Sequence, residues 1–598
     1  MKLGKFKSQY KQCILNINGL EEKSKSIAKM RSIAALLFFI TLYFGYKYYV
    51  AGYGLSLLAF LMFFVLVRRH QRVNEAKNYQ EALKKVLSTY INRFDDSWRD
   101  FADTGEDFIS ADFPQSIDLN VLGKDSLFQY INTARTAIGR KLLTGRLMRF
   151  IPQKADIEQN QRAVKELLAR EDFIIKFQCL LNLFDYENQR KGSSVEKFLT
   201  EMESNRIGIS QVMDVLKNVL PVITILSIIF AFLSPSPSVR IAPACLMLLQ
   251  LALSGFTYNI TQEKLKGLQG YYSEIETYQQ ILLHISQQEF KSDYLKELQK
   301  SLLGKHDAIK ALQELGGIGE AVKARYNGVF FIVFNGLLLW DWHCVAYFKK
   351  WMDKYAFHVR DWLTVIGEFE ALISLTVISH VKDEYTFPVI KEQIDPLLEF
   401  TDLKHPLIHS ESVVGNNFAG GSGTHIITGS NMSGKTTFLR TIGINLVLAY
   451  AGAPVLAQEF CVSAMALFTS INIQDSVNDG ISTFYAELLR IKAIVEFDSS
   501  NCGMIALIDE IFKGTNSQDR IIGAIETIKR ISNKHTLVFI TTHDFELCSI
   551  ETEHGLVSNY YFSEYYVNNK IEFDYKIRPG KCRTTNAKFL LQMVGIIE

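Results

Sequence analysis

The longest apolar stretch of the chain lies close to its start. Residues 32–67 carry one charged side chain, Lys47, and basic residues flank the stretch on both sides. A bend at Gly52 and Gly54 divides it into two predicted helices of about 15–18 residues, near the lower limit for crossing a bilayer. Tyrosines cluster at the bend, as aromatic side chains do at membrane surfaces. The pattern predicts a transmembrane hairpin; a buried helix pair in a soluble core and a cleaved signal peptide are the alternatives.

A second apolar pair lies further along the chain. Residues 218–233 and 241–258 are apolar runs, and the segment 234–238 (SPSPS) between them predicts a turn. Basic residues flank this pair as well. Two such hairpins predict four transmembrane helices, and an even number leaves both termini and the C-terminal domain on one side. The expected location is a membrane, with both termini in the cytoplasm, as for a multi-pass protein of a bacterial inner membrane.

Outside the hairpins, the spacing of apolar residues changes along the chain. Residues 74–217 and 260–385 have apolar positions three and four apart, which predicts amphipathic helices. Residues 386–598 contain short continuous apolar runs typical of buried parallel strands. The expected fold is multidomain, with a helical core that carries two hydrophobic hairpins, followed by an α/β P-loop domain. The expected parts are a basic N-terminal segment (1–31), a first hairpin (32–67), a first helical part (74–217), a second hairpin (218–258), a second helical part (260–385) and the α/β domain (386–598).

The clearest chemical motif lies within the α/β domain. Residues 429–436 (GSNMSGKT) fit the pattern G-x-x-x-x-G-K-[ST], between a β-branched run and an apolar-periodic helix. In such a P-loop, backbone N–H groups, the helix N-terminus and a lysine together bind the phosphates of a nucleotide. Lys435 is expected over the β- and γ-phosphates, and the Thr436 hydroxyl is expected to bind Mg²⁺. The predicted nucleotide-binding residues of the loop are Gly429, Ser430, Asn431, Met432, Ser433, Gly434, Lys435, Thr436 and Thr437.

Two further apolar runs end in polar residues that an ATPase needs. Residues 504–508 lead into Asp509, expected to hold Mg²⁺ through water, and Glu510, expected to polarise the attacking water. Residues 536–542 lead to His543, at the sheet edge where α/β folds bind ligands. A solvated acidic strand end and a surface histidine are the plain alternatives. After the P-loop, however, these residues predict ATP hydrolysis with Mg²⁺, and His543 is the predicted γ-phosphate sensor.

Composition limits the possible functions. The chain has 598 residues, enough for several domains, and its net charge of +2 gives no sign of a strongly basic, nucleic-acid-binding surface. Its eight cysteines are scattered without C-x-x-C pairs, which argues against a zinc site or a disulfide framework. Composition alone therefore gives no basis for predicting DNA binding.

Four segments together resemble the MutS family of ATPases. They are residues 428–437 (TGSNMSGKTT), 482–487 (STFYAE), 507–516 (LIDEIFKGTN) and 541–543 (TTH). More weakly, the beginning of the helical part resembles the family's core, or lever, domain in residues 118–128, 136–143 and 157–164. The resemblance implies that two subunits sandwich two nucleotides, as in the similar ABC ATPases, so a homodimer is expected.

The resemblance also implies roles for individual residues. Ser482, in the Ser-Thr-Phe motif, would contact the γ-phosphate held by the opposite subunit; without the resemblance it is an ordinary helix N-cap. Asn416 or Asn417 would bond the adenine, and Tyr575 would stack on it, although cross-strand packing explains Tyr575 equally well. The C-terminal helix expected at 586–597 resembles the family's dimer-stabilising end. The expected catalytic residues are Lys435, Ser482, Glu510 and His543, with Asn417 and Tyr575 as further nucleotide-binding residues.

Parts that touch mismatched DNA in this family have no counterpart that we recognise. Mismatch-repair members begin with a domain that inserts a Phe-x-Glu wedge at the mismatch, and the second hairpin lies where the family carries its DNA clamp. The expected function is a membrane-anchored, dimeric MutS-like ATPase that couples ATP to DNA binding or damage sensing. The alternatives are a membrane mechanochemical switch, which acts on a protein or membrane partner without DNA, and an ordinary mismatch-binding repair protein.

Overall fold

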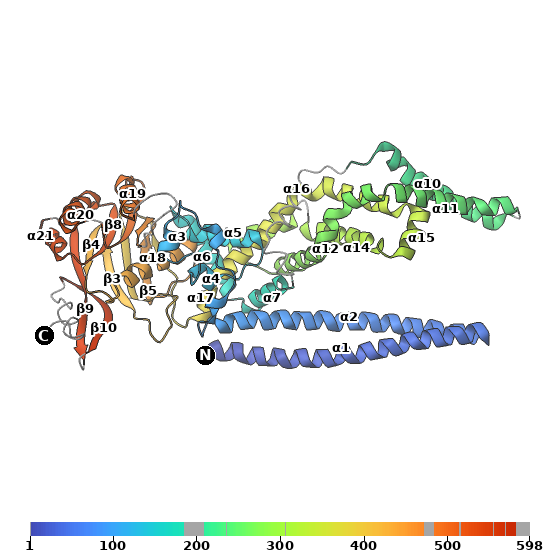
Figure 1. The fold of residues 1–598 in the computed structure, drawn as a ribbon, viewed down its shortest axis with the longest axis horizontal. Helices are drawn as coiled ribbons and strands as arrows, with labels where there is room; N and C mark the ends of the chain where they lie inside the picture. The colour runs from blue at the N-terminus through green and yellow to red at the C-terminus, as the bar shows by residue number, and fades with distance from the viewer. Residues whose placement is uncertain are drawn as a thin grey trace.

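The molecule is elongated, with an α/β domain at one end and long helices reaching toward the other (Figure 1). The structure is a computed structural model of the chain. It describes residues 2–48, 50–183, 208–234, 236–304, 307–471, 483–513, 516–553, 555–567 and 570–581. The sheets thus lie at one end of the long axis of the molecule and the helix tips at the other.

The first two helices form one long antiparallel hairpin. α1 (Lys2–Lys47) and α2 (Ala51–Asn92) pack against each other and point their tips away from the α/β domain (Figure 1). The polar residues expected as a separate segment, 1–31, are from Lys2 onward part of the same helix as the apolar tip. At the hairpin base, the Lys2 ammonium donates to the carbonyls of Ser379 (2.8 Å) and Lys382 (2.6 Å). The start of the chain is thus tied to the segment that leads into the α/β domain.

The glycines near the hairpin tip are packing residues. The expected bend at Gly52 and Gly54 is wrong, because both glycines lie inside α2 and the turn lies at Tyr48 and Val50. A Cβ on Gly52 would lie 2.5 Å from the Gly45 Cα. The absence of side chains at these positions lets the two helix backbones meet just below the turn.

A helical core follows the first hairpin and continues after the second. Its elements are η1 (Ser97–Asp100), η2 (Glu106–Phe108), α3 (Gln115–Asp118), α4 (Leu127–Ile131), α5 (Ala137–Leu147), α6 (Lys154–Leu168), α7 (Glu171–Leu181), α12 (Tyr258–Ser286), α13 (Asp293–Leu303), α14 (Ala308–Ala324), α15 (Gly328–Leu338), α16 (Trp340–Leu375) and α17 (Val377–Val381). α16 runs from the apolar helices to the region next to the α/β domain (Figure 1). It therefore connects the two ends of the helical core.

α16 and α5 are locked together near the α/β domain. A Cβ on Gly367 of α16 would lie 3.0 Å from the backbone nitrogen of Gly139 in α5, so the helices cross in direct contact. Next to the crossing, the buried Glu370 carboxylate accepts hydrogen bonds from the N–H groups of Arg135 (2.6 Å) and Thr136 (3.1 Å). Burial raises the pKa of Glu370 to about 7. The junction therefore fixes the end of α16 by backbone contact and buried hydrogen bonds.

Four helices among the described residues are long and apolar enough to cross a membrane. They are α1, α2, α10 (Gln211–Leu233) and the Val239–Phe256 part of α11 (Pro237–Phe256), and only 11–17% of their apolar windows is buried. The α10–α11 hairpin also points away from the α/β domain (Figure 1). Both apolar tips thus lie at the end of the molecule opposite the sheets.

The α/β domain holds the remaining elements, in two sheets. The described strands have the orders β1-β5-β2-β3 and β10-β9-β4-β8-β7-β6. In the larger sheet β9, β4, β8, β7 and β6 run parallel, and β10 pairs with β9 antiparallel. The bounds are β1 (Val389–Lys391), β2 (Leu397–Leu403), β3 (Asn416–Gly421), β4 (Gly423–Thr428), α18 (Lys435–Ala451), β5 (Glu459–Ser463), β6 (Ala466–Ser470), α19 (Thr483–Glu496), β7 (Met504–Asp509), α20 (Ser517–Ile531), β8 (Thr536–Thr542), η3 (Phe545–Ser549), α21 (Ile550–Glu553), β9 (Val557–Val567) and β10 (Lys570–Pro579).

Asp118 fixes the helical core to the α/β domain. Residues 118–128 form the end of α3, a loop and the start of α4. The fully buried Asp118 carboxylate accepts from the Thr469 hydroxyl (2.7 Å) and pairs with Arg490 of α19 (2.7 Å). The core therefore has a direct ionic contact with α19.

Candidate functional site

The loop between β4 and α18 has the backbone that a phosphate-binding pattern requires. Its φ angles are positive at Gly429 (153°), Met432 (67°) and Gly434 (104°). A Cβ on Gly429 would lie 3.0 Å from the Phe562 carbonyl oxygen, so the loop tolerates no side chain there. The glycines allow a tight turn that ends at the N-terminus of α18, where free N–H groups favour an anion.

Lys435 lies inside this loop. Its side chain is largely buried, and its ammonium donates to the carbonyls of Gly429 and Ser430, each at 2.9 Å. The Ser433 hydroxyl is also buried and has no hydrogen-bond partner among the described residues. A buried positive charge and an unpaired donor thus occupy the centre of the loop, which fits a bound phosphate group.

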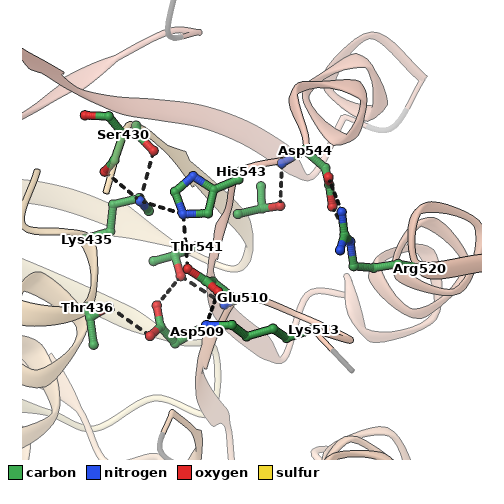
Figure 2. Close-up of polar contacts among 12 residues, drawn as sticks. Ser430, Lys435, Thr436, Asp509, Glu510, Lys513, Arg520, Thr541, His543 and Asp544 are labelled. Carbon is green, nitrogen blue, oxygen red and sulfur yellow. Dashed lines mark hydrogen bonds and ion pairs between the residues drawn. The ribbon is translucent and has the colours of Figure 1, made fainter. Parts of the chain in front are cut away.

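Thr436 and Asp509 form the pair expected to bind a cation. The Thr436 hydroxyl donates to one Asp509 carboxylate oxygen at 2.8 Å, and the Thr541 hydroxyl donates to the other. The parallel register β4-β8-β7 brings the ends of these strands to one edge of the sheet (Figure 2). No group of three or more His, Cys, Asp or Glu side chains gathers as a metal site in the described ranges. Mg²⁺ needs no such group, because one carboxylate, a hydroxyl, waters and nucleotide phosphates suffice as oxygen ligands.

Glu510 lies beside Lys435, with His543 between them. The His543 Nε2 atom is 3.1 Å from Glu510 Oε1 and 3.4 Å from the Lys435 ammonium (Figure 2). The Lys513 ammonium lies 2.7 Å from the other Glu510 oxygen. The hydrogen bond from His543, with the nearby lysine, lowers the pKa of Glu510 to about 2. Glu510 is therefore an ionised, partly exposed carboxylate at the edge of the sheet.

The loop after Glu510 is held by a residue for which no sequence motif predicts a role. The backbone of Glu510 (φ 54°) and Phe512 (φ 60°) is left-handed, a strained conformation for side chains of this size. The buried Glu487 carboxylate of α19 accepts a hydrogen bond from the Phe512 N–H, and burial raises the pKa of Glu487. Glu487 is the last residue of the segment 482–487 (STFYAE), but nothing in that segment indicates that it bonds the Phe512 N–H. It positions the Glu510 loop from the helix that follows Ser482.

Glu487→Ala is expected to slow ATP turnover roughly tenfold and to leave ATP binding nearly unchanged. The substitution leaves the Phe512 N–H buried without an acceptor, so the strained loop loses its anchor and Glu510 its fixed position. The measurement compares kcat with nucleotide affinity for the purified protein. Glu496→Ala, on an exposed position of the same helix, is the matched control. Equal kcat for both variants would contradict the positioning role.

A second unexpected pair supports the His543 loop. Arg520 of α20 donates two hydrogen bonds to the Asp544 carboxylate, both at 2.8 Å (Figure 2). The Asp544 N–H donates to the Thr542 hydroxyl at 3.0 Å. The bidentate pair holds the residue directly after His543, and its partners lie too far apart in sequence for any local pattern to indicate them.

The predicted adenine-side residues lie in two different environments. Tyr575 (φ 54°) is partly exposed, and its ring lies 3.1 Å from the position that a Cβ on Gly434 would take. The Asn416 side chain holds the backbone just after Tyr575: its amide donates to the Tyr575 carbonyl (3.0 Å), and its oxygen accepts from the Ile577 N–H (2.9 Å). Asn417 instead accepts from the Asp402 N–H at 2.8 Å. Tyr575 and the Asn416 side chain that holds it thus lie next to the loop between β4 and α18. Asn417 instead bonds the neighbouring strand β2.

Two predicted parts lie outside the described residues. Ser482 directly precedes α19, and the C-terminal helix expected at 586–597 follows the last described residue. Their roles stay predictions. The remaining predicted residues, Lys435, Thr436, Asp509, Glu510 and His543, come together at one edge of the larger sheet.

Comparison with known proteins agrees with this arrangement. Residues 425–595 match the family model MutS domain V. The DNA mismatch repair protein MutS of Clostridium novyi (strain NT) is 24% identical over 570 residues, which cover 88% of this chain. The chain thus contains a MutS domain V, and its likeness to a MutS protein extends over most of its length. It combines a helical N-terminal region that includes apolar helices with a C-terminal MutS domain V built on mixed sheets.

The likeness to other MutS proteins is partial. MutS protein homolog 4 of Mus musculus is 31% identical over 222 residues, or 35% of this chain and 22% of that protein. The DNA mismatch repair protein MutS of Chloroflexus aurantiacus (strain ATCC 29366 / DSM 635 / J-10-fl) is 27% identical over 262 residues, 42% of this chain and 27% of that protein. Even for the Clostridium protein, this chain spans only 61% of its length.

Proposed function

We propose that this chain is a membrane-anchored ATPase of the MutS family. The observation that carries the proposal is the convergence of Lys435, Thr436, Asp509, Glu510 and His543 at one sheet edge, next to a loop with an unpaired buried hydroxyl. Each of these side chains has the chemistry that ATP hydrolysis needs. None of them is required for the sheet core, which is apolar.

Each group would have its own task in this proposal. The loop N–H groups and Lys435 would bind and neutralise the nucleotide phosphates. Thr436 and Asp509 would hold Mg²⁺, which when bound supplies positive charge to the transferring phosphoryl group. Glu510 would orient a water and accept its proton, and His543, 3.1 Å away, would hold Glu510 and face the γ-phosphate. Catalysis would then rest on positioning and electrostatics.

The anchor would be the two apolar hairpins. Their windows are largely exposed and nearly uncharged, which favours burial in lipid. The polar part of α1, residues 2–31, would form a stalk about 45 Å long at 1.5 Å per residue, so the ATPase would sit away from the membrane surface. The contact of Lys2 with Ser379 supports placing the N-terminus and the ATPase on one side, the cytoplasm. Closure of a homodimer through Ser482 would move α19, and Asp118 and α16 offer a route to the hairpins.

Coupling to DNA is the second candidate. The relatives from Clostridium and Chloroflexus are named DNA mismatch repair proteins, and this supports a DNA-dependent output. Against it, the α10–α11 hairpin interrupts the helical core in sequence, where the family carries its DNA clamp, and the net charge is only +2. A mechanochemical switch that acts within the membrane would give a role to the α/β domain, the helical core and both apolar hairpins. We therefore favour it over coupling to DNA.

One preparation of the protein tests the membrane anchorage, the ATP hydrolysis and the choice between DNA binding and a membrane switch. We expect the protein to stay in the membrane pellet after high-salt washing and, once purified in detergent, to hydrolyse ATP only with Mg²⁺. DNA binding is then measured with and without ATP across a salt series on homoduplex, mismatched and branched DNA. ATP-sensitive binding with a steep salt slope would favour the DNA output over the membrane switch. Recovery of the protein in the soluble fraction would contradict the anchor, and absence of Mg²⁺-dependent turnover would contradict the ATPase.

A further inference from the structure

α15 is an apolar helix that the four candidate spans do not include. Its eleven residues, GVFFIVFNGLL, carry no charge, and Val329 (74%), Ile332 (56%) and Val333 (39%) are exposed. Its opposite face packs on α10 and α11, where a Cβ on Gly336 would lie 3.3 Å from the Leu251 side chain. The exposed face therefore continues the apolar surface of the second hairpin, beside which it lies in Figure 1.

α15 is too short to cross a bilayer by itself. Eleven residues rise about 16 Å, roughly half the thickness of the hydrocarbon core. Joined to α16 it would pass for one span, but the two helices meet at 80°. The beginning of α16 also carries charges that no span would hold, Asp341, Lys349, Lys350, Asp353 and Lys354. Length and charge thus argue against a fifth crossing.

The contacts at the hairpin base argue against it independently. Residues in direct contact lie on the same side of a membrane, and Lys2 bonds the carbonyl of Ser379 at 2.8 Å. The chain between them must therefore cross an even number of times. α1, α2, α10 and α11 account for four crossings, so α15 has to leave the membrane on the side where it enters.

The two ends of α15 are joined to each other. Arg325, just before it, and Asp341, just after it, form an ion pair of 2.9 Å with side chains only 1% and 2% exposed. Asn335 closes the break, because its amide donates to Asp341 (3.3 Å) and its carbonyl oxygen accepts from the Asp341 N–H (3.1 Å). At the other end, the Asn327 side chain accepts from the N–H groups of the first turn. The segments on either side of α15 are thus joined, and the polar groups of its backbone ends are satisfied, as lipid requires.

We infer that α15 is a re-entrant membrane helix, whose Val329–Ile332–Val333 face contacts the acyl chains of the leaflet nearer the ATPase. This inference rests on the membrane anchorage proposed above. It assigns to the core a third lipid contact, attached directly to the start of α16. A change in the position of α16 would then move a helix within one leaflet.

Site-specific fluorescence quenching tests the inference on the full chain in lipid vesicles. An environment-sensitive probe is attached to Val329→Cys or Ile332→Cys, in a background with Cys245→Ser, Cys461→Ser, Cys502→Ser and Cys582→Ser. Quenchers are placed on the lipid chains close to the headgroup or near the bilayer centre. Leu58→Cys, in the middle of the α2 apolar run, is the membrane control, and Ser301→Cys, exposed on α13, is the aqueous control.

We expect severalfold stronger quenching at both α15 positions than at Ser301→Cys, with the shallow quencher more effective than the deep one. Leu58→Cys should respond more to the deep quencher. Quenching at Leu58→Cys, together with α15 positions that behave like Ser301→Cys, would overturn the re-entrant helix and leave the anchorage standing. A deep-quencher preference at Val329→Cys and Ile332→Cys would also overturn it. No quenching at Leu58→Cys would refute the proposed anchorage itself, and the inference with it.

Discussion

Glu510→Gln is expected to stop ATP turnover while ATP binding persists. The substitution keeps the size of the side chain and its reach toward His543 but removes the carboxylate charge that orients and deprotonates water. Loss of a general base lowers kcat by about 100- to 10,000-fold. The Lys435 loop and the Thr436–Asp509 pair stay intact, so nucleotide affinity should change little. Single-turnover hydrolysis and equilibrium binding of labelled ATP measure the two effects separately.

The control for this variant is Glu526→Gln, which makes the same chemical change on the exposed surface of α20. Wild-type turnover by Glu510→Gln would remove Glu510 from the mechanism. Loss of binding as well as turnover would show that the substitution disturbs the site as a whole.

The pH dependence of turnover follows from the charge of Glu510. His543 and the nearby lysine hold the pKa of Glu510 at about 2, below its ordinary value, so the carboxylate stays ionised throughout the neutral range. Its contribution is present above the ordinary pKa of a glutamate and disappears only as the pH falls toward 2. A fall in turnover near pH 6 would therefore report a group other than Glu510.

Local patterns were sufficient to predict the residues of the candidate site that have the chemistry for ATP hydrolysis. The loop glycines, Lys435 and Thr436 lie within one strand-turn-helix. In this motif the glycines allow the backbone conformation, and the lysine and threonine supply the side chains that bind phosphate and Mg²⁺. Asp509, Glu510 and His543 follow buried runs whose parallel pairing brings their ends together. The apolar runs likewise indicated the hairpins. In all of these cases the informative residues are neighbours in sequence.

Features that depend on distant partners could not be predicted in the same way. Glu487 meets the Phe512 N–H across 25 residues, and Asp118 meets Arg490 across 372. The polar half of α1 shows only a sparse apolar stripe, because few of its side chains are buried; among them, Phe6 stacks on Tyr90 of α2 and Cys13 donates to the Gln80 carbonyl. Tertiary contact supplies what the local pattern lacks.

The glycines of the first hairpin show a related difficulty. A glycine between two apolar runs is compatible with a turn and with close helix packing. Packing applies at Gly52 because Gly45 lies directly opposite on α1, and no local rule shows this before the helices are paired. The turn formed instead at Tyr48 and Val50, without glycine.

Lys435→Ala is expected to weaken ATP binding by one to two orders of magnitude, and to lower turnover with it. The ammonium is the positive charge buried within the loop, and it is already oriented by the carbonyls of Gly429 and Ser430. Charge-assisted hydrogen bonds to phosphate contribute about 1.5–3 kcal/mol, so the loss of affinity is roughly 10- to 150-fold and exceeds that of any other single substitution considered. Titration of the purified variant with a fluorescent ATP analogue measures it directly.

Two further variants separate the charge of Lys435 from its shape. Lys492→Ala removes an exposed ammonium from α19 and should bind ATP normally. Lys435→Arg changes the shape of the side chain, because a planar guanidinium replaces the compact ammonium, and it should therefore weaken ATP binding. Since it retains the positive charge, the loss of affinity should be smaller than for alanine. If arginine restores full affinity, charge alone matters and the loop adapts around it. If Lys435→Ala binds ATP like the wild type, the loop is not the nucleotide site, and the proposed ATPase must be abandoned whatever the membrane experiments show.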